Sequence, residues 1–82
     1  MKAIVSIVIP VFNGEAFIKN CITSVINQTI QELQIIVVDD GSKDNTLQIL
    51  RAFENEDERI EVIHQDNAGV SAARNAGLQS VQ

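Results

Sequence analysis

Two adjacent aspartates, Asp39 and Asp40, end an apolar run and are followed by Gly41 and Ser42. Paired carboxylates in this setting can hold a metal, accept hydrogen bonds from a ligand, or cap the next helix. Because neighbouring carboxylates repel each other, such a pair is usually found where a donor or a cation meets it. We therefore expect the pair to contact a ligand, and a turn with a capping acid is the alternative.

A second group of candidate residues lies at the end of an earlier apolar run that contains Pro10 and Val11. Phe12 follows, and an aromatic ring near an acid can stack on a nucleobase, a contact worth about 1–3 kcal/mol; core packing is the alternative. Asn13 and Glu15 open the next expected helix, where a side chain can cap the helix and bind a ligand at once. At such a site, one aspartate of the Asp39–Asp40 pair would accept the N3–H of uracil, a donor that cytosine lacks.

The last candidates, Arg74 and Asn75, fall in the first turns of a helix expected over residues 70–81. An arginine near a helix start opposes the helix dipole, which favours an anionic partner such as a diphosphate. A salt bridge to an acid such as Asp66 is the alternative. His64 ends an expected strand without a Cys, His or acidic partner at metal-binding spacing, so we interpret it as a structural histidine.

Alternating strands and helices are expected to position these residues. The pattern predicts strands within 6–13 and over 33–38 and 60–64. It predicts helices over 15–27, about 45–55 and 70–81. Ser42 or Asp44 would be the N-cap of the second helix. The first two runs are apolar throughout, which is typical of strands covered on both faces, whereas the third alternates and suits a sheet edge. The expected fold is α/β, a three-layer open parallel sheet in the order βαβαβα. The candidate residues would lie together at the carboxyl edge of this sheet, where ligands of open α/β sheets bind.

Composition narrows the class of protein. The chain has 82 residues, 45% hydrophobic and 21% charged, which is typical of one small globular domain. A net charge of −5 argues against binding a nucleic-acid polymer through its phosphates. No apolar run approaches the ~18 residues of a membrane span, and no secretory signal is recognisable, so we expect a cytoplasmic protein. A lone Cys21 excludes an internal disulfide, and the dinucleotide-binding, P-loop and nucleophile-elbow glycine motifs are absent.

Four segments in order resemble the family 2 glycosyltransferases, which have the GT-A fold, over the amino-terminal nucleotide-binding half of that fold. The segments read VSIVIPVFN with Glu15, SVINQT, IVVDDGS with Asp44 and Thr46, and NAGVSAARNAG. The resemblance implies transfer of a sugar from a nucleoside-diphosphate donor, commonly a UDP-sugar, to an acceptor hydroxyl in glycan or cell-surface polysaccharide synthesis.

The resemblance also implies roles for individual residues. Phe12 stands where the family usually has a tyrosine and would stack on the base, with the backbone of Pro10 and Val11 around it. One aspartate of the Asp39–Asp40 pair would form a hydrogen bond with the base, and Asp40 is the favoured one. Positions that line the donor pocket in the family are also matched by Glu15, Arg74 and Asn75.

The family's acidic motif for Mg²⁺ or Mn²⁺ and its general base have no match within residues 1–82. We therefore expect residues 1–82 to be a single truncated domain, without a catalytic residue or a metal ligand of its own and inactive alone; the full-length enzyme would bind the metal and can lie at the inner face of the membrane. Truncation would expose the edge of the strand at residues 7–9 and invite self-association through this edge or through uncovered helix faces. The alternatives are a non-catalytic nucleotide-binding module and a phospho-receiver-like signalling domain.

Overall fold

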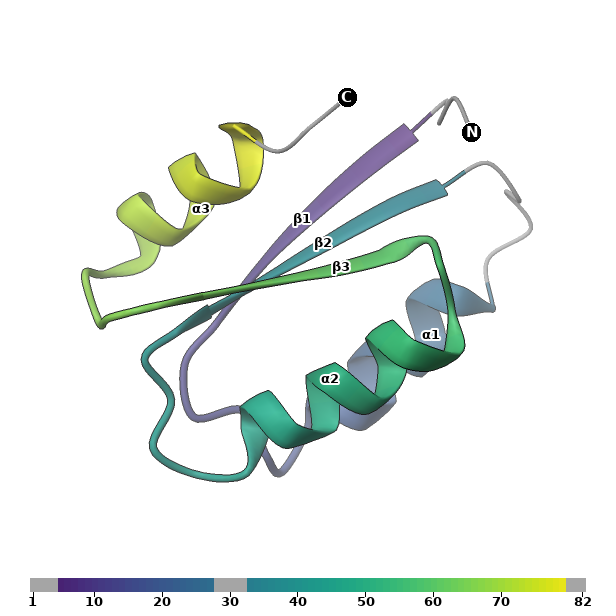
Figure 1. Ribbon diagram of the computed structural model, residues 1–82, viewed down its shortest axis with the longest axis horizontal. Helices are drawn as coiled ribbons and strands as arrows, with labels where there is room; N and C mark the ends of the chain where they lie inside the picture. The colour runs from purple at the N-terminus through teal and green to yellow at the C-terminus, as the bar shows by residue number, and fades with distance from the viewer. Residues whose placement is uncertain (1–4, 28–32, 80–82) are drawn as a thin grey trace.

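The structure, a computed structural model, describes residues 5–27 and 33–79. Strands and helices alternate along this part of the chain, as predicted (Figure 1). The elements are β1 (Val5–Val11), α1 (Ile18–Ile26), β2 (Leu33–Asp40), α2 (Thr46–Glu56), β3 (Ile60–Gln65) and α3 (Val70–Gln79). The strands form a parallel sheet with β2 in the centre, between β1 and β3. The α/β class, the βαβαβα order and the edge position of β3 are thereby confirmed.

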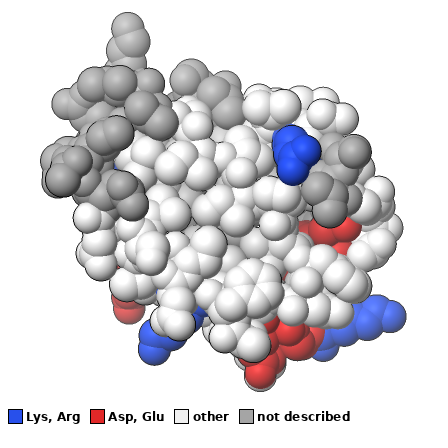
Figure 2. All heavy atoms as spheres, turned by 180° about the vertical axis from the view of Figure 1, so that it is seen from behind, with Lys and Arg blue, Asp and Glu red and all other residues white. Residues whose placement is uncertain are grey.

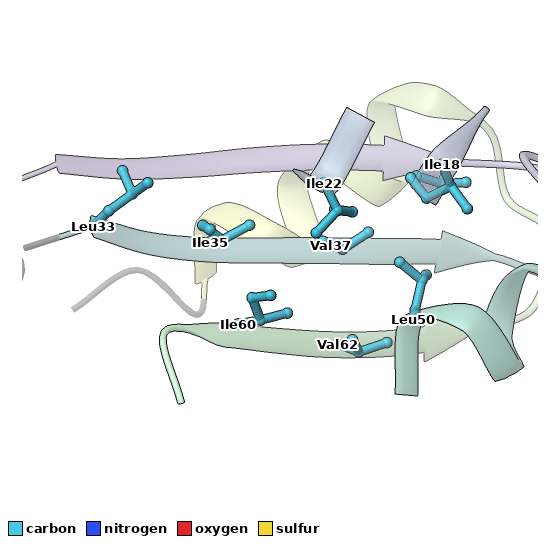
Figure 3. Close-up of a cluster of buried hydrophobic side chains, with 9 residues drawn as sticks. Ile18, Ile22, Leu33, Ile35, Val37, Leu50, Ile60 and Val62 are labelled. Carbon is cyan, nitrogen blue, oxygen red and sulfur yellow. The ribbon is translucent and has the colours of Figure 1, made fainter. Parts of the chain in front are cut away.

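Helices cover both faces of the sheet and make the expected three layers. Helices α1 and α2 lie on one face and α3 on the other (Figure 1). Successive side chains of β2 point to opposite faces, so Ile35 and Val37 pack toward α1 and α2, whereas Ile36 and Val38 pack with Ala73 of α3. Figure 3 shows the larger cluster, with side chains labelled from α1, α2, β2 and β3: Ile18, Ile22, Leu33, Ile35, Val37, Leu50, Ile60 and Val62.

Strand β1 is less covered than its sequence predicts. Residues 6–10 are only partly buried, and Val11 is the first buried side chain of the strand. The reason is its position, because β1 lies at an edge of the described sheet and pairs only with β2 there. Figure 2 views the molecule from this side, and the middle of the face carries no Lys, Arg, Asp or Glu atoms. Full burial on both faces is therefore confirmed for β2 and wrong for β1.

Two strands extend further toward their carboxyl ends than predicted. Strand β2 includes both Asp39 and Asp40, because these residues continue the parallel ladder opposite His64 and Gln65 of β3. The aspartates are thus fixed by strand geometry rather than by a turn that follows the strand. Strand β3 likewise ends at Gln65, one residue later than predicted.

Two helices begin later than predicted. Helix α1 starts at Ile18, after a turn over residues 15–17, and helix α2 starts at Thr46 with Asn45 at its N-cap rather than Ser42 or Asp44. Helix α3 is described to Gln79, and the last residues of the predicted helix lie outside the described residues.

Candidate functional site

The carboxyl ends of the parallel strands bring the candidate residues to one edge of the sheet. Val11 of β1 is the register partner of Asp39 in β2, and Asp39 is the partner of His64 in β3. Phe12 follows Val11 directly, and its side chain is 48% exposed. Phe12 and Asp40 therefore lie at the same end of adjacent strands, as the sequence predicted. This end of the sheet is called the rim below.

Asp40 organises the loop between β3 and α3. Its Oδ1 accepts hydrogen bonds from Gln65 Nε2 at 2.8 Å and from the Ala68 backbone N–H at 2.9 Å, and its Oδ2 accepts one from the Gly69 N–H at 2.9 Å. These donors, Gln65 first, lower the pKa of the Asp40 carboxyl, so it is ionised at neutral pH. A carboxylate has about four acceptor positions, so Asp40 keeps capacity for one further donor, on Oδ2.

Asp39 is held inside the protein by a different set of partners. Its side chain has no exposed area, its Oδ2 lies 2.8 Å from His64 Nδ1, and its Oδ1 accepts a 3.3 Å hydrogen bond from the Ser42 N–H. Both carboxylate oxygens are thus engaged by described residues. The spacing of Asp39 and His64 in the sequence does not predict this contact, whereas the parallel register, which makes the two residues partners, identifies it.

The two aspartates lie on opposite faces of the sheet because side chains alternate along a strand. Asp39 follows the alternation of Val37 and lies on the α1–α2 face, and Asp40 follows Val38 on the α3 face. In β1, Val8 packs in the α3-side cluster, which assigns Pro10 to the same face as Asp40. The rim therefore has two sides with different partners.

Asn13 and Glu15 do not cap α1, so the alternative that these residues are helix caps is wrong. The N-cap of α1 is Phe17, without a side-chain hydrogen bond. Asn13 instead contacts the loop after β2, where its N–H donates to Ser42 Oγ at 2.8 Å and its Oδ1 accepts from the Lys43 N–H at 2.8 Å. Its backbone φ of 52° lies in the left-handed region, which asparagine tolerates better than most residues.

Glu15 and its neighbour Gly14 extend the contact between the two loops. The Glu15 N–H donates to Asp44 Oδ2 at 3.1 Å, and Glu15 Oε1 accepts from the Asn45 N–H at 2.8 Å. The Gly14 N–H donates to Thr46 Oγ1 at 2.8 Å. Capping rules miss these bonds because they consider only residues close in sequence, and these partners are about 30 positions apart.

Arg74 and Asn75 are exposed on α3, four and five residues after its start. No carboxylate among residues 5–27 and 33–79 pairs with the Arg74 guanidinium, so the alternative of a salt bridge to Asp66 is wrong for the described structure. The charge of Arg74 is therefore presented to solvent.

The described residues do not fit a metal centre. Within residues 5–27 and 33–79, no three His, Cys, Asp or Glu side chains come together in a way that would bind a metal ion. Asp39 and Asp40 instead accept hydrogen bonds from the protein. No chemical step through a metal is assigned to these residues.

Comparison with known proteins decides the family. The family model described as Glycosyl transferase family 2 matches residues 6–82. The chain belongs to this family. Membership excludes the phospho-receiver-like alternative and confirms the resemblance found in the sequence.

Relatives in family 2 are several times longer than this chain. The uncharacterized glycosyltransferase EpsJ of Bacillus subtilis (strain 168) is 43% identical over 82 residues, which are 100% of this chain and 24% of EpsJ. The crystal structure of S. aureus TarS 1–349 in complex with UDP-GlcNAc is 31% identical with a TM-score of 0.87, over 100% of this chain and 24% of that chain. The chain thus spans about a quarter of the length of each of these two proteins.

A more distant structure shows the same fold. The mannosyltransferase PcManGT from Pyrobaculum calidifontis, in complex with GDP-Man and Mn²⁺, has a TM-score of 0.88 at 20% identity, over 100% of this chain and 25% of that chain. The arrangement of β1 to α3 is therefore that of the amino-terminal part of GT-A glycosyltransferases. In the part of this family 2 chain that the structure describes, no helix combines the length and the apolar character needed to cross a membrane.

Proposed function

We propose that this chain is the nucleotide-binding part of a longer glycosyltransferase domain. The whole enzyme would transfer a sugar from a UDP-sugar to an acceptor hydroxyl in glycan or cell-surface polysaccharide synthesis. The observation that carries the proposal is the placement of an exposed ring, Phe12, and an ionised acceptor, Asp40, at the same rim of adjacent parallel strands. Family membership and the likeness to TarS, whose structure contains UDP-GlcNAc, support it.

The base is recognised by shape and by one hydrogen bond. The Phe12 ring stacks on the base, and the backbone of Pro10 and Val11 borders it. Asp40 Oδ2 accepts the N3–H of uracil, using the acceptor position that the Gly69 N–H leaves free. Cytosine has no hydrogen on N3, so an ionised Asp40 favours uridine nucleotides over cytidine nucleotides.

The diphosphate is bound from the α3 side. Arg74 presents a permanent positive charge there, and a guanidinium binds phosphate oxygens through paired hydrogen bonds. Asn75, exposed next to it, supplies amide donors to the same group. A supporting role at the rim is assigned to Asn13, Glu15 and Asp39, since their side-chain oxygens accept hydrogen bonds from other residues of the protein.

We place the remaining catalytic groups outside residues 1–82. Deprotonation of the acceptor hydroxyl requires a positioned base, and we assign neither this base nor the ligands of Mg²⁺ or Mn²⁺ to the described residues. The metal, when bound in the longer enzyme, neutralises the diphosphate leaving group. The chain by itself would therefore bind the nucleotide and transfer no sugar.

The partly exposed edge of β1 supports a further proposal about partners. Ile7 and Ile9 are partly exposed on a strand whose ladder in the described sheet has one neighbour, β2. An exposed strand edge has unpaired backbone N–H and C=O groups that can pair with a strand of another chain. We propose that the isolated chain self-associates through this edge.

Calorimetric titration with UDP and CDP tests the proposed function. We expect UDP to bind more tightly than CDP, and Phe12→Ala to weaken UDP binding by about tenfold, within the range for loss of one stacking contact. Phe12→Tyr should bind as well as the parent. Leu78→Ala is the matched control, because Leu78 is exposed to a similar extent as Phe12 but lies near the C-terminal end of α3. No UDP binding by the parent, or binding that Phe12→Ala leaves unchanged, would contradict the proposal.

A further inference from the structure

The two loops that follow β1 and β2 are joined by reciprocal hydrogen bonds. The β1–α1 loop (residues 12–17) and the β2–α2 loop (residues 41–45) both lie at the rim. Backbone N–H groups of the first loop donate to the side chains of Ser42 and Asp44 in the second, and N–H groups of the second donate to the side chains of Asn13 and Glu15 in the first. We call this set of contacts the loop interlock. Each loop thus depends on side chains of the other for its conformation.

We propose that Glu15 and Asp44 are positioning residues that hold the end of β1, and with it Phe12, in place for the nucleotide. The inference rests on the proposed function and deepens it. It changes the role of Glu15 from contact with the donor, which the family resemblance implied, to support of the residue that makes the contact.

Phe12 is held through its backbone on both sides. Val11 before it is buried and lies in the ladder opposite Asp39. Asn13 after it is bound to the second loop by its own N–H and its side-chain Oδ1. The direction of an exposed ring depends on the backbone that carries it, so a displacement of the β1–α1 loop displaces the ring.

The acceptor pattern separates the roles of the two acids. Asp44 uses both oxygens, because Oδ2 accepts from the Glu15 N–H and Oδ1 accepts from the Thr46 N–H and the Thr46 hydroxyl. Glu15 uses one oxygen in the described contacts, since Oε1 accepts from the Asn45 N–H. An amide side chain has one acceptor oxygen. Glutamine at 15 can therefore keep its bond, whereas asparagine at 44 would lose one of the bonds that Asp44 makes.

This difference distinguishes positioning from direct contact. A carboxylate that binds a donor group of the ligand through its charge would be impaired by Glu15→Gln as well as by Glu15→Ala. A carboxylate that only accepts the Asn45 N–H would be impaired by alanine and rescued by glutamine. Comparing the UDP affinities of Glu15→Ala and Glu15→Gln therefore shows whether Glu15 positions the loop or contacts the ligand. A loss of affinity in Glu15→Ala alone does not separate these two roles.

The experiment measures UDP affinity and amide hydrogen exchange for the 82-residue chain and its variants. We expect Glu15→Ala and Asp44→Asn to weaken UDP binding by about three- to tenfold, the ratio that corresponds to one net hydrogen bond, and Glu15→Gln to stay within about twofold of the parent. Without ligand, the Asn45 N–H should exchange faster in Glu15→Ala and the Glu15 N–H faster in Asp44→Asn. Glu58→Ala, which removes an exposed acid between α2 and β3, is the control and should change neither quantity.

Each outcome decides the proposal. Glu15→Gln binding as weakly as Glu15→Ala would overturn it in favour of direct contact. Faster exchange with unchanged affinity would overturn the link from the loop interlock to the ligand and leave the proposed function standing. A parent chain that does not bind UDP would overturn the proposed function and the positioning role with it, while the exchange data still report on the interlock. If Asp44→Asn does not fold, Ser42→Ala, which removes the acceptor of the Asn13 N–H, makes the same comparison.

Discussion

Replacing Gly41 with alanine is expected to destabilise the protein and to disturb Asp40. Gly41 follows Asp40 at the rim and has a φ of +74°, in the region that favours glycine. A Cβ at this position would lie 2.6 Å from the backbone nitrogen of Asn67 and 3.1 Å from its Cα. Because backbone atoms cannot move aside by a rotamer change, the β3–α3 loop must shift. This loop contains the Ala68 and Gly69 N–H donors to Asp40.

The magnitude follows from two costs. A left-handed conformation costs about 1–2 kcal/mol for a residue with a Cβ. Relief of a steric overlap in a packed region typically costs about 1–3 kcal/mol more. The expected loss in the free energy of unfolding is therefore about 2–5 kcal/mol, a large part of the about 4–12 kcal/mol that is typical of a domain of this length.

Urea denaturation followed by circular dichroism measures this loss. Gly69→Ala is the matched control, because Gly69 has a φ of +96° but no atom within 4 Å of the added Cβ. Gly69→Ala should show the conformational cost alone, so Gly41→Ala should be the less stable of the two by about 1–3 kcal/mol. UDP affinity should also fall in Gly41→Ala, since the donors that orient Asp40 are displaced. Equal stability of the two variants would refute the account of how closely the two loops approach.

Other predictions concern the core, the acid response and self-association. Leu50→Ala removes a fully buried side chain and should cost about 2–5 kcal/mol in urea denaturation; a loss below 1 kcal/mol would contradict the described packing of α2. The Val62 N–H and Arg51 lower the pKa of the Glu54 carboxyl in the folded protein. The stability that ionised Glu54 contributes to the fold is therefore present above its ordinary pKa of 4.5 and is lost as the pH falls through its lower pKa in the folded protein. Glu54→Gln should therefore flatten the loss of stability below pH 4.5 in acid titrations followed by circular dichroism, and an unchanged slope would argue against it. Light scattering during size-exclusion chromatography should show a mass that rises with concentration, and a dispersed monomer at every concentration would count against pairing through the β1 edge.

The elements and the shared rim were predictable because they depend on local patterns. The fully apolar run of β2 and the alternation in β3 reflect how many faces of each strand are covered, and parallel connections place all the carboxyl ends together. For β1 the apolar run predicts full coverage, whereas the family resemblance predicts an exposed edge at residues 7–9. Burial of an edge strand depends on which neighbours it has, and its own sequence does not state them.

The partners of the polar residues depend on contacts that no local pattern contains. Asp39 and Asp40 are adjacent and chemically identical, yet the pleat sends one toward His64 and the other toward the β3–α3 loop. Capping rules assign Asn13 and Glu15 to the helix that follows them, whereas the structure pairs them with a loop about 30 residues away. Such partners become visible only when the sheet register is known.

The measurement that tests the central claim most directly is an NMR titration of the 82-residue chain with UDP, repeated with Asp40→Asn. The account predicts that UDP shifts the backbone signals of Phe12 and Gly41 and the signals around Arg74, and that Asp40→Asn weakens UDP binding and reduces the preference for UDP over CDP. Shifts confined to residues away from the rim, or UDP affinity that Asp40→Asn leaves unchanged, would contradict it.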